Sequence, residues 1–275
     1  MFGPSDLSED HFLGGRLRLL QPQEGYRAGV DPVLLAAAVP AQLGQSVLEL
    51  GLGAGAASLC LAARVPGLAL AGLELQPAYA ALARENATAN GIALEVVEGD
   101  LAAMPDALRA RRFDHVLMNP PYFHRAGGTP AANPGRETAL GEALPLSAWV
   151  EAAARRLAPG GTLSAIQRAE RLADLVSACA GRLGSLEVKP VAPRAGREAS
   201  LVLLRARKGG RAAFRLHAPL ILHEGARHEH DGESYRPEAQ AILRDGGALD
   251  LQPDNGLARS SAQAGAARGK ARRGA

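Results

Sequence analysis

The sequence predicts an α/β fold in which helices cover both faces of a mostly parallel, seven-stranded sheet. Short apolar runs of strand length alternate with longer Ala- and Leu-rich segments through the middle of the 275-residue chain. This alternation is typical of parallel sheets, because a crossover must carry the chain back between parallel strands. The last two strand-like runs have no helix between them, so we expect them to form an antiparallel hairpin at the end of the sheet.

Each element has its own local signal. The strand-like runs are Ser46–Leu50, Leu68–Leu73, Leu94–Glu98, Phe113–Met118, Thr162–Ile166, Leu186–Val191 and Ser200–Ala206. The main helix-like segments between them are Ala56–Arg64, Pro77–Asn90, Ser147–Leu157 and Glu170–Arg182. Pro77 suits a first helical turn, where its missing N–H costs nothing, and Pro159-Gly160-Gly161 suits a helix end.

Two further elements are expected before the first of these strands. Leu17–Leu20 is strand-like, and an Ala/Leu-rich helix opens near Asp31-Pro32. Asp31 is a natural N-cap, because its carboxylate can accept a backbone N–H of the first turn. The same side chain could instead border the methionine end of a cofactor, and the sequence leaves both roles open.

Composition indicates one domain and a tail. The content of hydrophobic residues, 47%, is ample for a core, and the net charge is +3. No acidic residue follows Asp254, whereas the end of the chain carries Arg259, Arg268, Lys270, Arg272 and Arg273. We therefore expect a single domain over residues 1–254 and a basic, disordered tail over 255–275. Such a tail could touch nucleic-acid phosphates or be a solvated terminus.

The same sequence favours a cytoplasmic monomer without a metal. Its two cysteines, Cys60 and Cys179, form neither a disulfide framework nor a metal-binding spacing, which suits a reducing compartment. There is no apolar span of 18 residues and no secretory leader pattern, so no membrane association is expected. His223, His228 and His230 lie close together, but their spacing is no standard zinc pattern.

A glycine-rich motif, Glu49-Leu50-Gly51-Leu52-Gly53-Ala54-Gly55, occupies the junction between the first sheet strand and its helix. Gly51, Gly53 and Gly55 permit a tight turn and a close approach of a ligand to the backbone. Glu74 ends the second strand, where a carboxylate can accept hydrogen bonds from both ribose hydroxyls. This pattern also fits a dinucleotide fingerprint, so the motif alone leaves NAD and S-adenosylmethionine open.

Polar residues at successive strand ends favour S-adenosylmethionine. Glu49 would repel a pyrophosphate, whereas it would attract a sulfonium and an amino group. Asp100 follows the third strand and could hold the adenine amino group of the cofactor. Asn119 follows the fourth strand. Because ligands bind at the carboxyl edge of an open parallel sheet, these strand ends together predict one site.

The most informative feature is Asn119-Pro120-Pro121-Tyr122, which ends the run Phe113–Met118. The amide oxygen of Asn119 and the carbonyl of Pro120 can accept both hydrogens of an exocyclic amino group. The ring of Tyr122 can stack on a flat base. The set suits an enzyme that methylates a planar nitrogen, although a proline-punctuated turn after a strand would show the same residues.

With these residues in place, the chain from about Leu13 to Arg244 resembles the bacterial adenine-N6 methyltransferases that modify a valine tRNA next to its anticodon. The resemblance rests on Phe12-Leu13-Gly14-Gly15, Tyr26-Arg27-Ala28-Gly29-Val30-Asp31, the glycine motif, Glu74, Asp100, Asn119-Pro120-Pro121-Tyr122, Arg136, Leu146-Ser147-Ala148-Trp149 and Leu157-Ala158-Pro159-Gly160-Gly161. Ala28, Val30 and the Arg-rich tail depart from the pattern of that family.

The resemblance implies a Rossmann-like class I methyltransferase fold, S-adenosylmethionine as cofactor and a base flipped out of an RNA loop. Asn119, Pro120 and Tyr122 would then be catalytic, with the base clamped by Tyr122. Pro121 and Phe123 would line the substrate pocket. Arg125 and Arg136 follow on the loop after the motif, where they could meet RNA phosphates or be ordinary polar residues of a loop.

Three rival functions remain open. A protein glutamine N5-methyltransferase would use the same motif, because an amide nitrogen is also planar, but such enzymes usually carry a helical module that the 45 residues before Ser46 leave little room for. DNA adenine methylation normally needs an added target-recognition region. A non-catalytic RNA-binding protein would use the basic tail alone.

Overall fold

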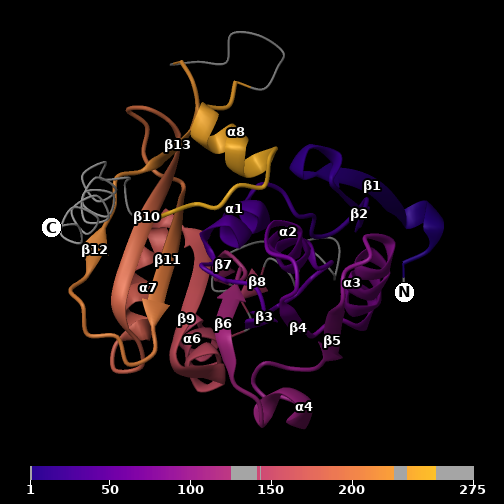
Figure 1. The fold of residues 1–275 in the computed structure, drawn as a ribbon, viewed down its shortest axis with the longest axis horizontal. Coiled ribbons are helices and arrows are strands. Elements are labelled where there is room, and N and C mark those ends of the chain that lie inside the picture. Colours follow the sequence, from indigo (N-terminus) through magenta and orange to yellow (C-terminus); the bar gives the residue numbers. More distant parts are fainter. Residues whose placement is uncertain (1, 125–140, 143, 226–233, 252–275) are drawn as a thin grey trace, which may run out of the picture.

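The structure is a computed structural model that describes residues 2–124, 141–142, 144–225 and 234–251. Within these residues a nine-stranded sheet lies between two layers of helices (Figure 1). Its strands are β3 (Ser46–Leu50), β4 (Ala69–Glu74), β5 (Leu94–Glu98), β6 (Phe113–Met118), β9 (Leu157–Arg168), β10 (Gly184–Arg194), β11 (Leu201–Arg207), β12 (Arg215–Leu216) and β13 (Leu220–His223).

The helices and the smaller strands complete the described chain. The helices are α1 (Asp31–Ala38), α2 (Ala56–Arg64), α3 (Pro77–Ala89), α4 (Asp106–Arg109), α6 (Leu146–Arg156), α7 (Leu172–Cys179) and α8 (Pro237–Leu243). Two further pairs of strands stand apart from the main sheet: β1 (Leu7–Phe12) with β2 (Leu17–Pro22), and β7 (Phe123–His124) with β8 (Gly141–Glu142). No described helix is both long and apolar enough to cross a membrane.

The strand order confirms the predicted fold class. The order is β12-β10-β11-β9-β6-β3-β4-β5. The strands β5, β4, β3, β6 and β9 pair in parallel, whereas β11 runs antiparallel to both β9 and β10. Beyond the seven predicted strands, β12 and β13 add parallel pairs along β10. Both are very short, so their formation depends on the edge of β10 rather than on a periodic pattern of their own.

Alternation along the strands divides the core into two clusters. Val47 of β3 and Leu203 of β11 face the cluster that contains α1, α2 and α8. Leu48 of β3 and Leu204 of β11 face the other cluster, which α4, α6 and α7 cover. Successive side chains of a strand point to opposite faces of the sheet, and here both faces are buried under helices. The sequences of these strands are therefore continuously apolar.

Helix α1 is apolar around its whole circumference, because α2, α8 and the sheet enclose it. Every residue from Pro32 to Ala38 is buried. Its final carbonyls are satisfied from outside: Arg64 Nη2 donates to Ala36 O at 3.0 Å, and Arg205 Nη2 donates to Ala38 O at 2.7 Å. Two cations at the negative end of the helix also suit its dipole.

The proposed N-cap role of Asp31 is wrong. Val30 occupies the N-cap position without a side-chain hydrogen bond, and Asp31 is the first helical residue. The carboxylate of Asp31 accepts a hydrogen bond from the Tyr122 hydroxyl instead. Tertiary contact with the strand-end motif has thus replaced the local cap.

Two predicted boundaries also shift. The Pro159-Gly160-Gly161 segment lies inside β9, where a register shift against β6 absorbs it, so the strand begins at Leu157. Gly161 is required there, since a Cβ would lie 2.9 Å from Asp114 O. The expected helix over Glu170–Arg182 begins as a 3-10 turn, and its α-helical part covers only Leu172–Cys179.

The N-terminal pair β1–β2 is joined to the domain through α3 (Figure 1). Asn86, which is fully buried, accepts from Leu20 N at 2.8 Å and donates to Leu20 O and Ala54 O at 3.0 Å each. Asn90, one turn later, pairs with the backbone of Arg18 in the same way. One helix therefore supplies the exposed edge of β2 with partners through two amide side chains.

We predict that Asn86→Ala lowers the free energy of unfolding by about 3 kcal/mol or more, because three buried or partly buried backbone groups lose their partner. Each unsatisfied group costs roughly 1–3 kcal/mol before relaxation. Urea denaturation of the wild type and variant measures the difference. Asn90→Ala is the matched control, since Asn90 binds the same strand from a less buried position and should cost less. Equal losses in the two variants would contradict this account.

Candidate active site

The turn between β3 and α2 depends on glycine at three alternate positions. Gly51, Gly53 and Gly55 have φ values of +71°, +56° and +89°. These lie in the left-handed region, which side chains other than glycine rarely enter. At Gly51 space is restricted as well, since a Cβ would lie 2.8 Å from the ring of Trp149 on α6. The turn therefore brings bare backbone to the wall of a cavity.

Glu74, at the end of β4, supports this turn. Its Oε2 accepts from Gly53 N at 2.7 Å, and its Oε1 accepts from Gln76 N at 2.9 Å. Burial raises the pKa of this carboxyl, and the backbone hydrogen bonds partly offset the rise. Because each carboxylate oxygen can accept a second hydrogen bond, Glu74 keeps acceptor capacity toward the cavity that it lines.

Glu49, at the carboxyl-terminal half of β3, is almost completely buried. Its Oε2 accepts from both the N–H and the hydroxyl of Ser58, at 2.9 and 2.6 Å. Burial raises the pKa of Glu49 to about 8; the bonds from Ser58 lower it in part, and the charge of Glu74 raises it further. A cation in the cavity would reverse this effect by favouring the charged carboxylate.

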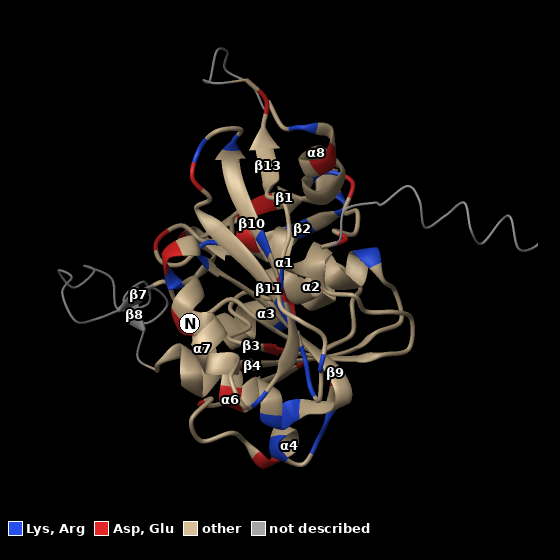
Figure 2. Cartoon of the chain, turned by 90° about the vertical axis from the view of Figure 1, so that its left-hand side faces the viewer, with Lys and Arg blue, Asp and Glu red and all other residues tan. Residues whose placement is uncertain are grey.

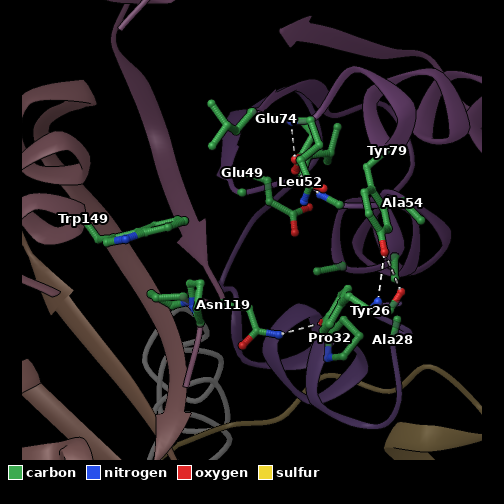
Figure 3. Close-up of a pocket in the computed structure, with 18 of the residues that line it drawn as sticks. Tyr26, Ala28, Pro32, Glu49, Leu52, Ala54, Glu74, Tyr79, Asn119 and Trp149 are labelled. Carbon is green, nitrogen blue, oxygen red and sulfur yellow. Dashed lines mark hydrogen bonds between the residues drawn. The ribbon is translucent and has the colours of Figure 1, made fainter. Parts of the chain in front are cut away.

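The amide of Asn119 has one occupied end and one open end. Its Nδ2 donates to the Tyr26 hydroxyl at 3.3 Å, which sets the orientation of the amide (Figure 3). Its Oδ1 is buried and has no hydrogen-bond partner. A buried acceptor without a partner is costly and therefore rare in folded proteins. This atom is the clearest sign in the cavity of a missing donor.

The buried side chain of Tyr79 holds the backbone of Tyr26 beside Asn119. The Tyr79 hydroxyl accepts from Tyr26 N at 2.9 Å and lies 3.2 Å from Tyr26 O, to which it can donate. Burial, followed by the charges of Asp31 and Glu49, raises the pKa of Tyr26, so its hydroxyl stays protonated at neutral pH.

The carbonyl of Pro120 is held from β9. Gln167 is fully buried, and its Nε2 donates to Pro120 O at 3.3 Å, while its Oε1 accepts from Arg168 N at 2.8 Å. A carbonyl oxygen has two lone pairs, so Pro120 O can still accept one more hydrogen bond. The contact fixes the direction of the second acceptor that the sequence predicted.

Two contacts fix the ring of Tyr122, one at its hydroxyl group and one on a face of the ring. Its hydroxyl donates to Asp31 Oδ2, and the guanidinium of Arg168 lies over the ring at 5.3 Å from the centroid. Burial, together with the charge and hydrogen bond of Asp31, raises the pKa of Tyr122. Because Arg168 covers one face, a stacked ligand would have to use the other.

These groups line one cavity at the carboxyl edge of the sheet, where Glu49 and Asn119 extend from neighbouring strands into the same space (Figure 3). Of the predicted site residues, the walls include Glu49, Gly51, Gly53, Glu74, Asn119, Pro120, Pro121 and Tyr122. Gly55 shapes the turn without lining the cavity, and Asp31 reaches it through Tyr122.

Other predicted residues are not part of these walls. Asp100 is exposed after β5, and its Oδ1 accepts from Ala102 N at 2.8 Å, so its contact in this structure is that of a loop acid. Arg125 and Arg136 lie outside the described residues, and so do His228, His230 and the tail from 255 onward. Phe123 is described only as part of strand β7.

The structure adds three residues to which the sequence assigned no role: Tyr26, Gln167 and Trp149. Tyr26 and Trp149 belong to segments that support the family resemblance, and Trp149 is also the single tryptophan of the chain, which is a signal that sequence reasoning could have used. Gln167 gave no such signal, because it lies among the apolar residues of a strand and its partner is a backbone atom 47 positions away.

Comparison with known proteins shows the family of the chain. The sequence profile of the methyltransferase small domain family matches residues 29–177, which is more than half of the chain. A protein from Porphyromonas gingivalis named tRNA1(Val) (adenine(37)-N6)-methyltransferase is 34% identical over 160 residues, which cover 54% of this chain and 61% of that relative. A protein of the same name from Aeromonas hydrophila is 31% identical over 66% of this chain and 77% of the relative.

Solved structures lead to the same fold. A crystal structure named as a predicted O-methyltransferase from Agrobacterium tumefaciens is 30% identical, with a TM-score of 0.65 over 80% of this chain and 98% of that one. The 16S rRNA N2 G1207 methyltransferase of T. thermophilus, solved with AdoMet and guanosine, is 22% identical with a TM-score of 0.51 over 74% of this chain and 50% of that one, and shares the fold. The chain therefore belongs to the methyltransferase small domain family.

Proposed function

We propose that this protein is an S-adenosylmethionine-dependent methyltransferase that acts on the N6 amino group of adenine in RNA, next to the anticodon of a tRNA. The observation that carries the proposal is the buried, unpartnered Oδ1 of Asn119 in a cavity with the Pro120 carbonyl and the Tyr122 ring. An adenine amino group offers two N–H donors in the plane of a flat ring, which matches two acceptors and one stacking surface.

The remaining walls fit the cofactor. The left-handed turn at Gly51 and Gly53 lets a ligand lie against the backbone. Glu74 has acceptor capacity left for ribose hydroxyls, and Glu49 is a buried carboxyl that a positive charge would stabilise in its ionised form. S-adenosylmethionine, when bound there, would supply the electrophilic methyl group.

The residues of the chain would act mainly by positioning. The adenine nitrogen is a poor nucleophile, because its lone pair is delocalised into the ring. Asn119 Oδ1 and Pro120 O would accept its two hydrogens and direct the lone pair toward the methyl group. Holding two reactants in line is worth up to roughly 7–11 kcal/mol in favourable cases. Tyr122 would stack on the flipped base, a contact worth about 1–3 kcal/mol.

The RNA substrate is supported by the relatives. Proteins named tRNA1(Val) (adenine(37)-N6)-methyltransferase match this chain at 29–36% identity, and the relative from Dickeya chrysanthemi is covered over 87% of its length. The chain spans 61% of the Porphyromonas gingivalis relative, so tRNA and the position of the base are proposals for the protein as a whole.

We predict that the protein transfers labelled methyl groups from S-adenosylmethionine to unmodified tRNA, and that nucleoside digestion yields N6-methyladenosine. Ribosomal RNA and a release-factor-like protein are parallel substrates in the same assay. Label in the protein pool alone would show that the methyl acceptor is a glutamine amide and not adenine. Cofactor binding and RNA binding without label in any pool would favour the non-catalytic RNA-binding protein.

We predict that Asn119→Ala lowers kcat by about 10²–10³-fold or more, since loss of one preorganised hydrogen-bonding group in an active site typically has an effect of this size. Cofactor affinity should stay nearly unchanged, because Asn119 would contact the amino group of the base. Single-turnover transfer and calorimetric titration of the cofactor separate the two effects.

Tyr26→Phe is the matched control for orientation. It keeps the Asn119 acceptor and the buried ring but removes the hydroxyl that accepts from Asn119 Nδ2. A smaller loss of kcat than in Asn119→Ala is expected. Wild-type turnover by Asn119→Ala would exclude the proposed role of the amide.

We predict that the affinity for S-adenosylmethionine rises with pH up to about pH 8. The pKa of Glu49 is about 8 in the free protein, so the carboxyl is mostly neutral at pH 6.5 and must lose its proton to attract a cation. Below this pKa, the affinity for S-adenosylmethionine should rise by up to about tenfold per pH unit if binding requires the charged carboxylate. Calorimetric dissociation constants at pH 6.5, 7.5 and 8.5 measure it.

Two comparisons isolate the role of Glu49. Glu49→Gln keeps an acceptor for Ser58 but cannot ionise, so its profile should be flatter. S-adenosylhomocysteine keeps the amino group but lacks the sulfonium charge, so its affinity for the wild type should rise less with pH. Superimposable profiles for wild type and Glu49→Gln would rule out this titration.

A further inference from the structure

A second cleft, away from the cavity, is lined almost entirely by cations. Its lining residues are Arg112, Glu151, Ala154, Arg155, Arg156, Arg182 and Lys208. They come from the segment before β6, from α6, from the turn after α7 and from the position directly after β11. Five positive side chains thus face one carboxylate, and that carboxylate, Glu151, already pairs with Arg155 and lies 3.5 Å from Arg182.

Three of these cations contact only backbone carbonyls among the described residues. Arg112 Nη1 donates to Arg111 O at 2.9 Å, and Arg156 Nη1 donates to Leu108 O at 3.0 Å. Lys208 Nζ donates to Ala154 O and Leu157 O at 2.7 and 2.8 Å. These neutral partners fix the side chains in place and leave their positive charges uncompensated.

The charges affect one another. Burial, and then the charge of Arg112, lowers the pKa of both Arg156 and Lys208. Lys208 caps the end of α6 and Arg156 supports α4, so both have structural roles. Neither role requires Arg112, Arg155 or Arg182, which are exposed around the same cleft. An anion bound in the cleft would relieve this repulsion.

Helix α6 connects this cleft to the cavity. Trp149 lines the cavity near its start, and Arg156 lines the cleft at its end. Seven residues at 1.5 Å each separate them by roughly 10 Å along the axis. Figure 2 shows lysine and arginine segments gathered around α4, below α6. Along β6, seven residues at about 3.3 Å each separate Arg112 from Asn119, so the cleft opens at the opposite edge of the sheet, roughly 23 Å from the acceptor atoms. An RNA stem repeats its phosphates along its whole length, so it can span that distance while a base of the same RNA enters the cavity.

We propose that this cleft binds backbone phosphates in the stem of the RNA whose base enters the cavity. The inference rests on the proposed function for the identity of the RNA, whereas binding itself requires no methyl transfer. Arg112, Arg155 and Arg182 are exposed around the cleft and have further N–H groups that can donate to phosphate oxygens. Such contacts position an RNA without reading its sequence. The regular spacing of phosphates along a stem suits several cations in one groove.

The double variant Arg112→Glu/Arg155→Glu tests the proposal. Fluorescence anisotropy with an unmodified tRNA transcript measures affinity over a range of salt concentrations. We expect affinity at moderate salt to fall about tenfold or more. The slope of log K against log salt concentration should be shallower by about two, one for each phosphate contact removed. Affinity for S-adenosylmethionine should not change, because neither residue lines the cavity.

The matched control is Arg197→Glu/Arg236→Glu, which makes the same change of net charge at exposed positions outside the cleft. Its affinity should stay within about threefold of wild type. Equal losses in both double variants would overturn the proposal, because overall charge alone would explain them. Unchanged RNA affinity with binding to anionic phospholipid vesicles lost only in the cleft variant would also overturn it, in favour of a membrane surface.

Activity separates this proposal from the proposed function. RNA binding that depends on the cleft, in a protein that transfers no methyl group to any pool, would leave the cleft proposal standing and reject the function. If the protein transfers methyl groups to tRNA, but Arg112→Glu/Arg155→Glu binds tRNA with wild-type affinity, the function stands and the cleft proposal is rejected.

Discussion

The arrangement of the site depends on the hydrogen-bonded pairing of β3 between β4 and β6. In this register Leu50 lies opposite Leu73 on one side and Met118 on the other, so the three strands end together. Glu49, Glu74 and Asn119 come from positions far apart in the chain, yet parallel pairing places them at one edge. Loss of this register by one residue would turn each of these side chains to the opposite face of the sheet.

Around that edge, the geometry of the Asn-Pro-Pro-Tyr motif is set by residues outside it. Tyr26 holds the amide of Asn119, Gln167 holds the carbonyl of Pro120, and Asp31 holds the hydroxyl of Tyr122. These partners come from the segment before α1, from β9 and from the start of α1. A preorganised set of this kind avoids much of the ordering that binding would otherwise require.

The same site lowers the stability of the protein. The Oδ1 of Asn119 is buried without a partner, and Glu49 is a carboxyl whose pKa is about 8 in the folded state against 4.5 for an exposed group. Because the folded state binds this proton more tightly, the contribution of Glu49 to stability is present below pH 4.5 and is lost as the pH rises through 8. Apolar side chains at these positions would remove both costs, so folding alone gives no reason for these residues, whereas the proposed ligand binding does.

The sequence alone determined the fold class, the strand-end positions of Glu49, Glu74 and Asn119, and the glycine turn, because apolar runs and left-handed glycines are local signals. It did not determine the role of Asp31, the length of β9 or the strands β12 and β13, since each of these depends on contact with a distant segment. Gln167 is the clearest example, because only the packing of β9 beside β6 brings its amide to Pro120. Local patterns thus specified many of the groups that line the cavity, whereas tertiary packing added others and decided how all of them are oriented.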